Sequence, residues 1–159
     1  LSMLLLLVGC TTPNAYVEPK TQQYFVLDCY HLDDSKEGMF NWESYSVDMI
    51  DGKNVDFGMG IIGGGKAPKK LTLGKHKILA QAKFHKGTNS PCMPCGALIP
   101  MTINIKKSGH YRFTGRVNEM DAKFEVWIED VTTSKKVTKI YTRELKSQTS
   151  NDVYIPIMI

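Results

Sequence analysis

The stretch Lys77-Ile-Leu-Ala-Gln-Ala-Lys-Phe-His85 alternates between two kinds of side chain. The apolar set is Ile78, Ala80, Ala82 and Phe84, and the polar set is Lys77, Gln81, Lys83 and His85. In an extended chain, successive side chains point to opposite faces, so a period of two predicts a β-strand with one buried face. We therefore expect a strand here that packs its apolar side on a core.

The same period continues through the second half of the chain. Three further runs place an apolar residue at every second position: Ile99, Met101, Ile103 and Ile105; Tyr111, Phe113, Gly115 and Val117; Phe124, Val126 and Ile128. Ser108-Gly109 separates the first two runs and is a turn signal. We predict further strands over 136–144 and over 152–159, where Pro156 suits an edge strand.

The first half is also strand-like. Residues 23–31 are rich in aromatic and β-branched side chains and predict the first strand. Tyr45, Val47 and Met49 then alternate with Ser46, Asp48 and Ile50. Asp51-Gly52 follows this run, and Asp-Gly between alternating runs predicts a two-residue hairpin turn of type I′.

No window shows a convincing helical period. Strands with one apolar face, joined by turn signals, predict antiparallel sheets packed on each other. We expect an all-β fold, an antiparallel Ig-like β-sandwich of about 7–9 strands formed by residues 23–159. The apolar fraction of 42% and the charged fraction of 23% are ordinary for a folded globular domain.

The N-terminal residues have a different character. Residues 1–8 are almost entirely apolar, and Gly9-Cys10 and the polar Thr11-Thr12-Pro13-Asn14 follow them. An apolar run that ends in small residues is typical of an export signal, and this run is far shorter than the about 20 residues that span a bilayer. An alternative is a core strand or helix in which Cys10 is a buried thiol.

Leu7-Val8-Gly9-Cys10 resembles the lipobox of bacterial lipoproteins. The resemblance implies that the thiol of Cys10 receives a diacylglycerol and that the chain is cut before Cys10. Residues 1–9 would then be the signal, truncated at its start because no Met or basic residue opens it, and residues 10–22 a flexible lipidated tether. The implied location is the bacterial cell envelope. In this family, an Asp directly after the lipidated cysteine favours the inner membrane. Thr11 occupies that position here, so the resemblance favours the outer membrane.

Four segments resemble the β-modules of PEGA domains and small DUF2846-type lipoproteins. They are Met49-Ile-Asp-Gly-Lys53, Leu71-Thr-Leu-Gly-Lys-His-Lys-Ile-Leu79, Ser108-Gly-His-Tyr-Arg-Phe113 and Val126-Trp-Ile-Glu-Asp130. The resemblance covers residues 45–140 and implies a non-catalytic β-sandwich module.

Cys92-Met93-Pro94-Cys95 is a CxxC pair in a loop between two predicted strands. Three interpretations are open. The pair forms a local disulfide in an oxidising compartment, it works as a redox dithiol, or it binds a soft metal ion with Met93, His85 or His31 as further ligands. A disulfide is the interpretation that we favour. Cys29 lies in an apolar strand, and we expect it to be buried rather than cross-linked to the CxxC pair.

Trp127 falls on the polar side of its strand, and Arg112 and Arg116 on the polar side of the preceding one. Tryptophan and arginine concentrate at the energetic centres of interfaces, so these three residues are a candidate interaction surface. The alternative is a tryptophan covered by a loop. We expect the histidines to be solvated, and no catalytic motif or paired carboxylates occur, so we predict neither an enzyme nor a cofactor.

Basic and acidic residues, 20 and 16, are scattered along the chain and give a formal net charge of +4. No basic block is typical of a nucleic-acid-binding arm, so we predict no nucleic-acid partner.

The leading hypothesis is a membrane-anchored envelope lipoprotein that binds a protein, a glycan or another envelope component. One alternative is a thiol- or metal-handling lipoprotein that uses Cys92 and Cys95. Another is a lysozyme inhibitor or a pilotin-like secretion accessory.

Overall fold

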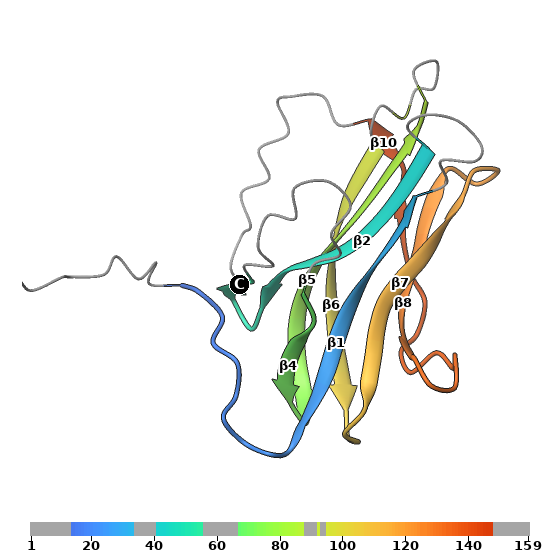
Figure 1. The fold of residues 1–159 in the computed structure, drawn as a ribbon. Helices are drawn as coiled ribbons and strands as arrows, with labels where there is room; N and C mark the ends of the chain where they lie inside the picture. The colour runs from blue at the N-terminus through green and yellow to red at the C-terminus, as the bar shows by residue number, and fades with distance from the viewer. Residues whose placement is uncertain (1–13, 34–40, 56–66, 88–91, 93–94, 148–159) are drawn as a thin grey trace, which may run out of the picture.

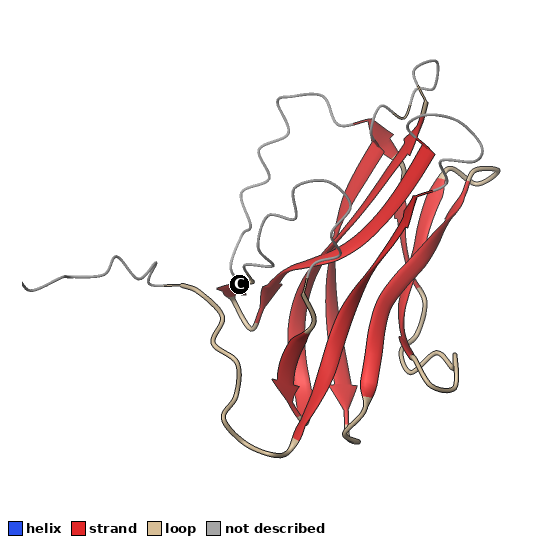
Figure 2. Ribbon diagram, viewed as in Figure 1, coloured by secondary structure: helices blue, strands red, loops and turns tan. Residues whose placement is uncertain are grey.

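The computed structural model describes residues 14–33, 41–55, 67–87, 92 and 95–147. Over these residues the fold is all-β (Figure 2). The ten strands are β1 (Tyr24–Asp33), β2 (Asn41–Ile50), β3 (Lys53–Asn54), β4 (Lys69–Thr72), β5 (Gly74–Lys86), β6 (Cys95–Ile105), β7 (His110–Asn118), β8 (Lys123–Asp130), β9 (Tyr141–Glu144) and β10 (Lys146–Ser147). No helix among the described residues is long and apolar enough to cross a membrane.

Strand β1 joins two layers of the molecule (Figure 1). Its last residues, Tyr30 to Asp33, pair with β2, and the order continues through β5 and β6 to β10. Its first residues pair with β4 on one side and with β7 on the other, and the order continues to β8 and β9. The all-β prediction is confirmed. The described residues form ten strands rather than the predicted 7–9, and two of these, β3 and β10, are only two residues long.

One pair of strands departs from the predicted antiparallel arrangement. Strands β1 and β7 run parallel, with Leu27 opposite Tyr111 and Cys29 opposite Phe113. Sequence alternation defines the two faces of a strand but not the direction of its neighbour. A long connection between β1 and β7, which contains β2 to β6, makes the parallel pairing possible.

The core lies between the layers and follows the predicted period of two. Phe25 and Leu27 of β1 are buried, as are most residues of the predicted apolar faces of the central strands, while Val117 is partly buried. These buried residues are Ile78, Ala80, Ala82, Phe84, Ile99, Met101, Ile103, Ile105, Tyr111, Phe113, Phe124, Val126 and Ile128. Tyr45 of the first layer meets Phe113 of the second edge-to-face, with ring centres 6.3 Å apart. On the far side, the Tyr141 hydroxyl donates to the Thr102 carbonyl at 3.1 Å and links β9 to β6.

The hairpin after β2 confirms the type I′ prediction. Asp51 and Gly52 both have positive φ, 50° and 76°, as this turn requires. Within β2, however, the predicted alternation of Tyr45, Val47 and Met49 with Ser46, Asp48 and Ile50 does not continue to the end of the strand. The register shifts between Val47 and Met49, and Ile50 enters the core instead. A bulge of one residue exchanges the two faces of a strand beyond it.

Two further predictions differ from the structure. The strand expected over 136–144 is limited to β9, because residues 131–140 form a loop in which only Lys136 bridges to Glu129. The strand expected over 152–159 lies outside the described residues, as do residues 1–13. The part of the predicted flexible tether that is described, from Asn14 onward, contacts the domain: the Tyr16 amide donates to the Asn54 carbonyl at 2.7 Å.

Candidate functional site

The predicted tryptophan surface lies on the outer face of β7 and β8. The antiparallel register places Arg112 opposite Glu129, Thr114 opposite Trp127 and Arg116 opposite Glu125. Cross-strand partners share a face, so the two arginines and the tryptophan lie together as predicted from their alternation with the buried residues. We call this group the tryptophan surface: Arg112, Arg116, Glu125, Trp127, Glu129 and Lys136.

Trp127 is half-buried and held from two sides. Its indole Nε1 donates to Glu129 Oε2 at 3.1 Å, and Lys136 Nζ lies 4.4 Å from the ring centre. The cation therefore rests on the electron-rich face of the indole. Lys136 is a further member of this surface, which the alternation within the strands did not predict. It enters the surface because residues 136–138 fold back along β8, where the Val137 amide donates to the Ile128 carbonyl.

The two arginines of the surface have different surroundings. Arg116 Nε lies 2.6 Å from Glu125 Oε2, and its side chain is 63% exposed. Arg112 extends toward β1, with its guanidinium 5.6 Å from the centre of the Tyr30 ring. Lys136 therefore lies on the indole, Arg116 and two carboxylates share its face of the sheet, and Arg112 points away from it toward β1. Such a surface offers donors, acceptors and a flat apolar ring to a polar partner.

The CxxC pair is a disulfide in the structure. Cys92 and Cys95 are joined, their Cα atoms are 4.5 Å apart, and both residues are buried. Cys95 begins β6 opposite Phe84 of β5, and the Lys86 amide donates to the Cys92 carbonyl at 3.2 Å. Cys29 is not part of this bond and packs partly buried against the core. The bond therefore pins the β5–β6 connection to the two strands that it joins.

Among the described residues, no metal site is assembled around this pair. Metal binding by cysteine requires thiolates, and the two sulfur atoms are bonded to each other. His85 instead stacks on Trp42, with ring centres 5.7 Å apart. Within the described ranges no three His, Cys, Asp or Glu side chains are grouped as a metal would need. Met93 and the side chain of His31 lie outside the described residues.

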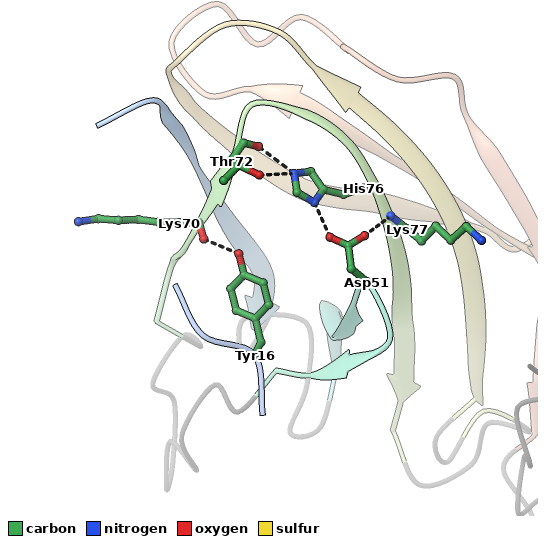
Figure 3. A network of polar contacts seen from close by, with 6 residues as sticks. All are labelled: Tyr16, Asp51, Lys70, Thr72, His76 and Lys77. Carbon is green, nitrogen blue, oxygen red and sulfur yellow. Dashed lines mark hydrogen bonds and ion pairs between the residues drawn. The ribbon is translucent and has the colours of Figure 1, made fainter. Parts of the chain in front are cut away.

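A second polar group surrounds His76 at the start of β5 (Figure 3). Asp51 Oδ2 lies 2.7 Å from His76 Nδ1, and the Thr72 carbonyl oxygen lies 2.8 Å from Nε2. The other carboxylate oxygen of Asp51 accepts the Lys77 amide at 2.8 Å. His76 is only 7% exposed, and Phe25 packs edge-to-face on its ring.

This geometry describes a structural clamp. An Asp–His pair beside a Thr hydroxyl has the composition of a nucleophile–base arrangement, but both ring nitrogens of His76 face oxygen acceptors. Nε2 is 2.8 Å from the Thr72 carbonyl and 3.4 Å from its hydroxyl, so the carbonyl is the better partner. The two ring nitrogens are therefore occupied by the Asp51 carboxylate and by a backbone carbonyl, and the Thr72 hydroxyl makes the longer contact. The clamp ties the Asp51-Gly52 turn to β4 and β5.

The prediction that His76 is a solvated residue is wrong. Counted back from Ile78, His76 falls on the same face as the buried residues of β5. The period therefore contained a signal for its burial, which the adjacent lysines obscured. His110 is exposed as predicted and lies 3.6 Å from Asp28.

Tyr16 extends the clamp to the N-terminal segment. Its hydroxyl donates to the Lys70 carbonyl at 2.8 Å, and the Lys70 amide donates to Glu18 Oε1 at 3.2 Å. Burial, together with the carboxylates of Asp51 and Glu18, raises the pKa of Tyr16 to about 12. The hydroxyl therefore stays protonated and able to donate at neutral pH.

We compared the chain with family models, with curated proteins and with solved structures, and none of them matches it.

Proposed function

We propose that this protein is a lipid-anchored lipoprotein of the bacterial cell envelope, with the outer membrane as the favoured site. In this proposal, its β-sandwich is a non-enzymatic module that binds a protein, a glycan or another envelope component through the tryptophan surface. The anchor is a lipid on Cys10, and no cofactor or nucleic acid takes part.

The observation that carries the binding proposal is the position of Trp127. A large aromatic ring on the outer face of a sheet, partly exposed and contacted by Glu129 and Lys136, is already held in one orientation. Binding to a fixed ring loses little side-chain entropy, and tryptophan and arginine dominate interface energetics. The exposed Arg116 beside it adds a donor for carboxylate, carbonyl or hydroxyl groups.

Substitution of Trp127 should weaken this binding strongly. We expect Trp127→Ala to lower affinity by about thirtyfold, which corresponds to the about 2 kcal/mol of an interface hot spot. To detect the partner in cells, a photo-crosslinking residue is placed at position 116, on the surface, or at position 53, on β3 of the other layer. An adduct is expected at position 116 only, and it should fall sharply when Trp127→Ala is added. Identical adducts from both positions would contradict the proposal.

The anchor is tested separately at Cys10. The full chain, expressed in a bacterium behind a complete signal, should incorporate a fatty-acid analogue and partition with membranes. Cys10→Ala should abolish the label, because the thiol is the atom that receives the lipid, while Cys29→Ala serves as the matched control and should keep it. Equal labelling of the wild type and Cys10→Ala would exclude lipidation at this cysteine.

A further inference from the structure

One end of the molecule combines the β6–β7 turn with the β8–β9 loop, the lower end in Figure 1. The two segments are hydrogen-bonded neighbours: the Val131 amide donates to the His110 carbonyl at 2.9 Å. Their exposed basic residues are Lys106, Lys107, Lys135, Lys136 and Lys139. We call these five residues the lysine end.

The charge of the two segments that form this end is wholly positive. Residues 105–117 and 131–142 contain no acidic residue. The whole chain carries a formal net charge of +4, so without these five lysines the remainder would carry −1. None of the five forms an ion pair with a described residue; Lys136 and Lys139 lie over the rings of Trp127 and Tyr141.

The acidic groups nearest to this end, Asp28, Glu129 and Asp130, form no ion pair with any of the five lysines. Asp130 Oδ1 accepts the amides of Thr132 and Thr133, at 2.8 Å and 3.0 Å. Glu129 accepts from Trp127, and Asp28 lies beside His110. The opposite end, at the β7–β8 turn, carries Glu119 and Asp121, and Glu119 forms an ion pair with Lys86.

The β8–β9 loop also exposes two aliphatic side chains among its lysines. Val137 is 41% exposed and Ile140 is 42% exposed. Lysines that flank exposed aliphatic residues suit a bilayer interface, where the ammonium groups meet anionic headgroups and the aliphatic groups enter the acyl boundary. A nucleic acid or another soluble polyanion would neutralise the lysines, but it offers no apolar environment in which Val137 and Ile140 could be buried.

From this combination we infer that the lysine end is a second, reversible membrane contact, which binds the surface of a bilayer containing anionic lipid. This contact is separate from the lipid anchor, and it shares only Lys136 with the tryptophan surface. In an anchored protein it would hold the domain against the bilayer. Its test uses Cys10→Ala protein throughout, so the outcome does not depend on lipidation.

The experiment measures co-sedimentation of full-length Cys10→Ala protein with vesicles. One set contains phosphatidylglycerol mixed with phosphatidylcholine, and the other phosphatidylcholine alone. Each lysine near an anionic surface contributes a factor of about five to binding. The triple variant Lys106→Ala, Lys107→Ala, Lys135→Ala should therefore bind the anionic vesicles about a hundredfold more weakly. The wild-type surface should also lose binding in 1 M salt, where the screening length falls to about 3 Å.

The matched control removes the same charge elsewhere. Lys53→Ala, Lys123→Ala, Lys146→Ala changes three exposed lysines outside the lysine end and should stay within about threefold of the parent. If both triple variants lost vesicle binding equally, the net charge of the protein would explain the binding, and the proposal would be overturned. Equal binding to both vesicle types would overturn it as well. The paired change Val137→Ser, Ile140→Ser should weaken vesicle binding without altering retention on heparin; no effect on vesicles would refute membrane contact.

Discussion

Replacement of Phe113 by alanine should lower the free energy of unfolding by about 3–5 kcal/mol. Phe113 is completely buried and lies in the middle of β7, where the two layers face each other. Its ring contacts the edge of Tyr45 from β2, and its backbone lies opposite Cys29 of β1. Truncation at this position removes contacts with both layers and leaves a cavity that neither rigid sheet can close.

The measurement is denaturant unfolding followed by far-ultraviolet circular dichroism, which should give a β-type spectrum and one transition. Two surface substitutions act as controls. Thr102→Ala and Lys83→Ala alter side chains on the outer faces of β6 and β5 and should change the free energy of unfolding by less than about 0.5 kcal/mol. If Phe113→Ala proved as mild as these controls, the core assignment between the layers would be wrong.

The side chains that meet at this core could be predicted from the sequence, because burial in a sheet has a period of two. Phe113, Val126 and Ile103 alternate with polar neighbours, and each is buried where the alternation places it. The Asp51-Gly52 turn was equally local, since two residues with positive φ determine a type I′ hairpin. Each of these features depends on a few consecutive residues.

Features that depend on distant partners could not be predicted in the same way. Nothing within β1 indicates that β7 will run parallel to it. Leu71 to Leu79 resembled a single strand entry, but Gly74, with φ of 121°, divides it between β4, which pairs with β1, and β5, which pairs with β2. The bulge that buries Ile50 likewise becomes visible only in the register with β5.

The candidate site likewise contains features that depend on nearby residues and features that depend on distant ones. Arg112, Arg116 and Trp127 could be assigned to one outer face from parity and from the adjacency of β7 and β8. Lys136 reaches the indole through a loop that folds back on β8, and the period of a strand contains no information about a loop. The burial of His76 could have been predicted from its position in the alternation of β5. Its partners Asp51 and Thr72 could not have been predicted, because they lie on other elements.

Gly115 shows how a residue with little propensity for a strand is required by packing. Gly115 lies on the inner side of β7 opposite Val126, with the buried ring of Tyr45 above it. A Cβ at this position would lie 2.5 Å from the Glu125 carbonyl oxygen and 2.6 Å from Tyr45 Cε1. Both distances are well inside van der Waals contact. Glycine here permits the close approach of the first layer to the second.

We therefore expect Gly115→Ala to lower the free energy of unfolding by about 3 kcal/mol, although alanine is an innocuous residue in most strands. Neither obstacle can move freely. The Glu125 carbonyl belongs to the backbone of β8, and the Tyr45 hydroxyl is fixed by donation to Glu43 Oε2 at 2.7 Å. Burial and the Glu43 carboxylate raise the pKa of Tyr45 above its usual value, so this donor persists through neutral pH.

A double-mutant cycle with Tyr45→Leu distinguishes the two obstacles, because leucine has no atom at the position of Cε1. If the ring is the main barrier, Gly115→Ala should cost markedly less in the Tyr45→Leu background, with a coupling above about 0.5 kcal/mol. A cost that persists in both backgrounds would assign the strain to the β8 carbonyl. If Gly115→Ala instead left the unfolding transition of the otherwise unchanged protein in place, the close packing of β2 on β7 would be refuted.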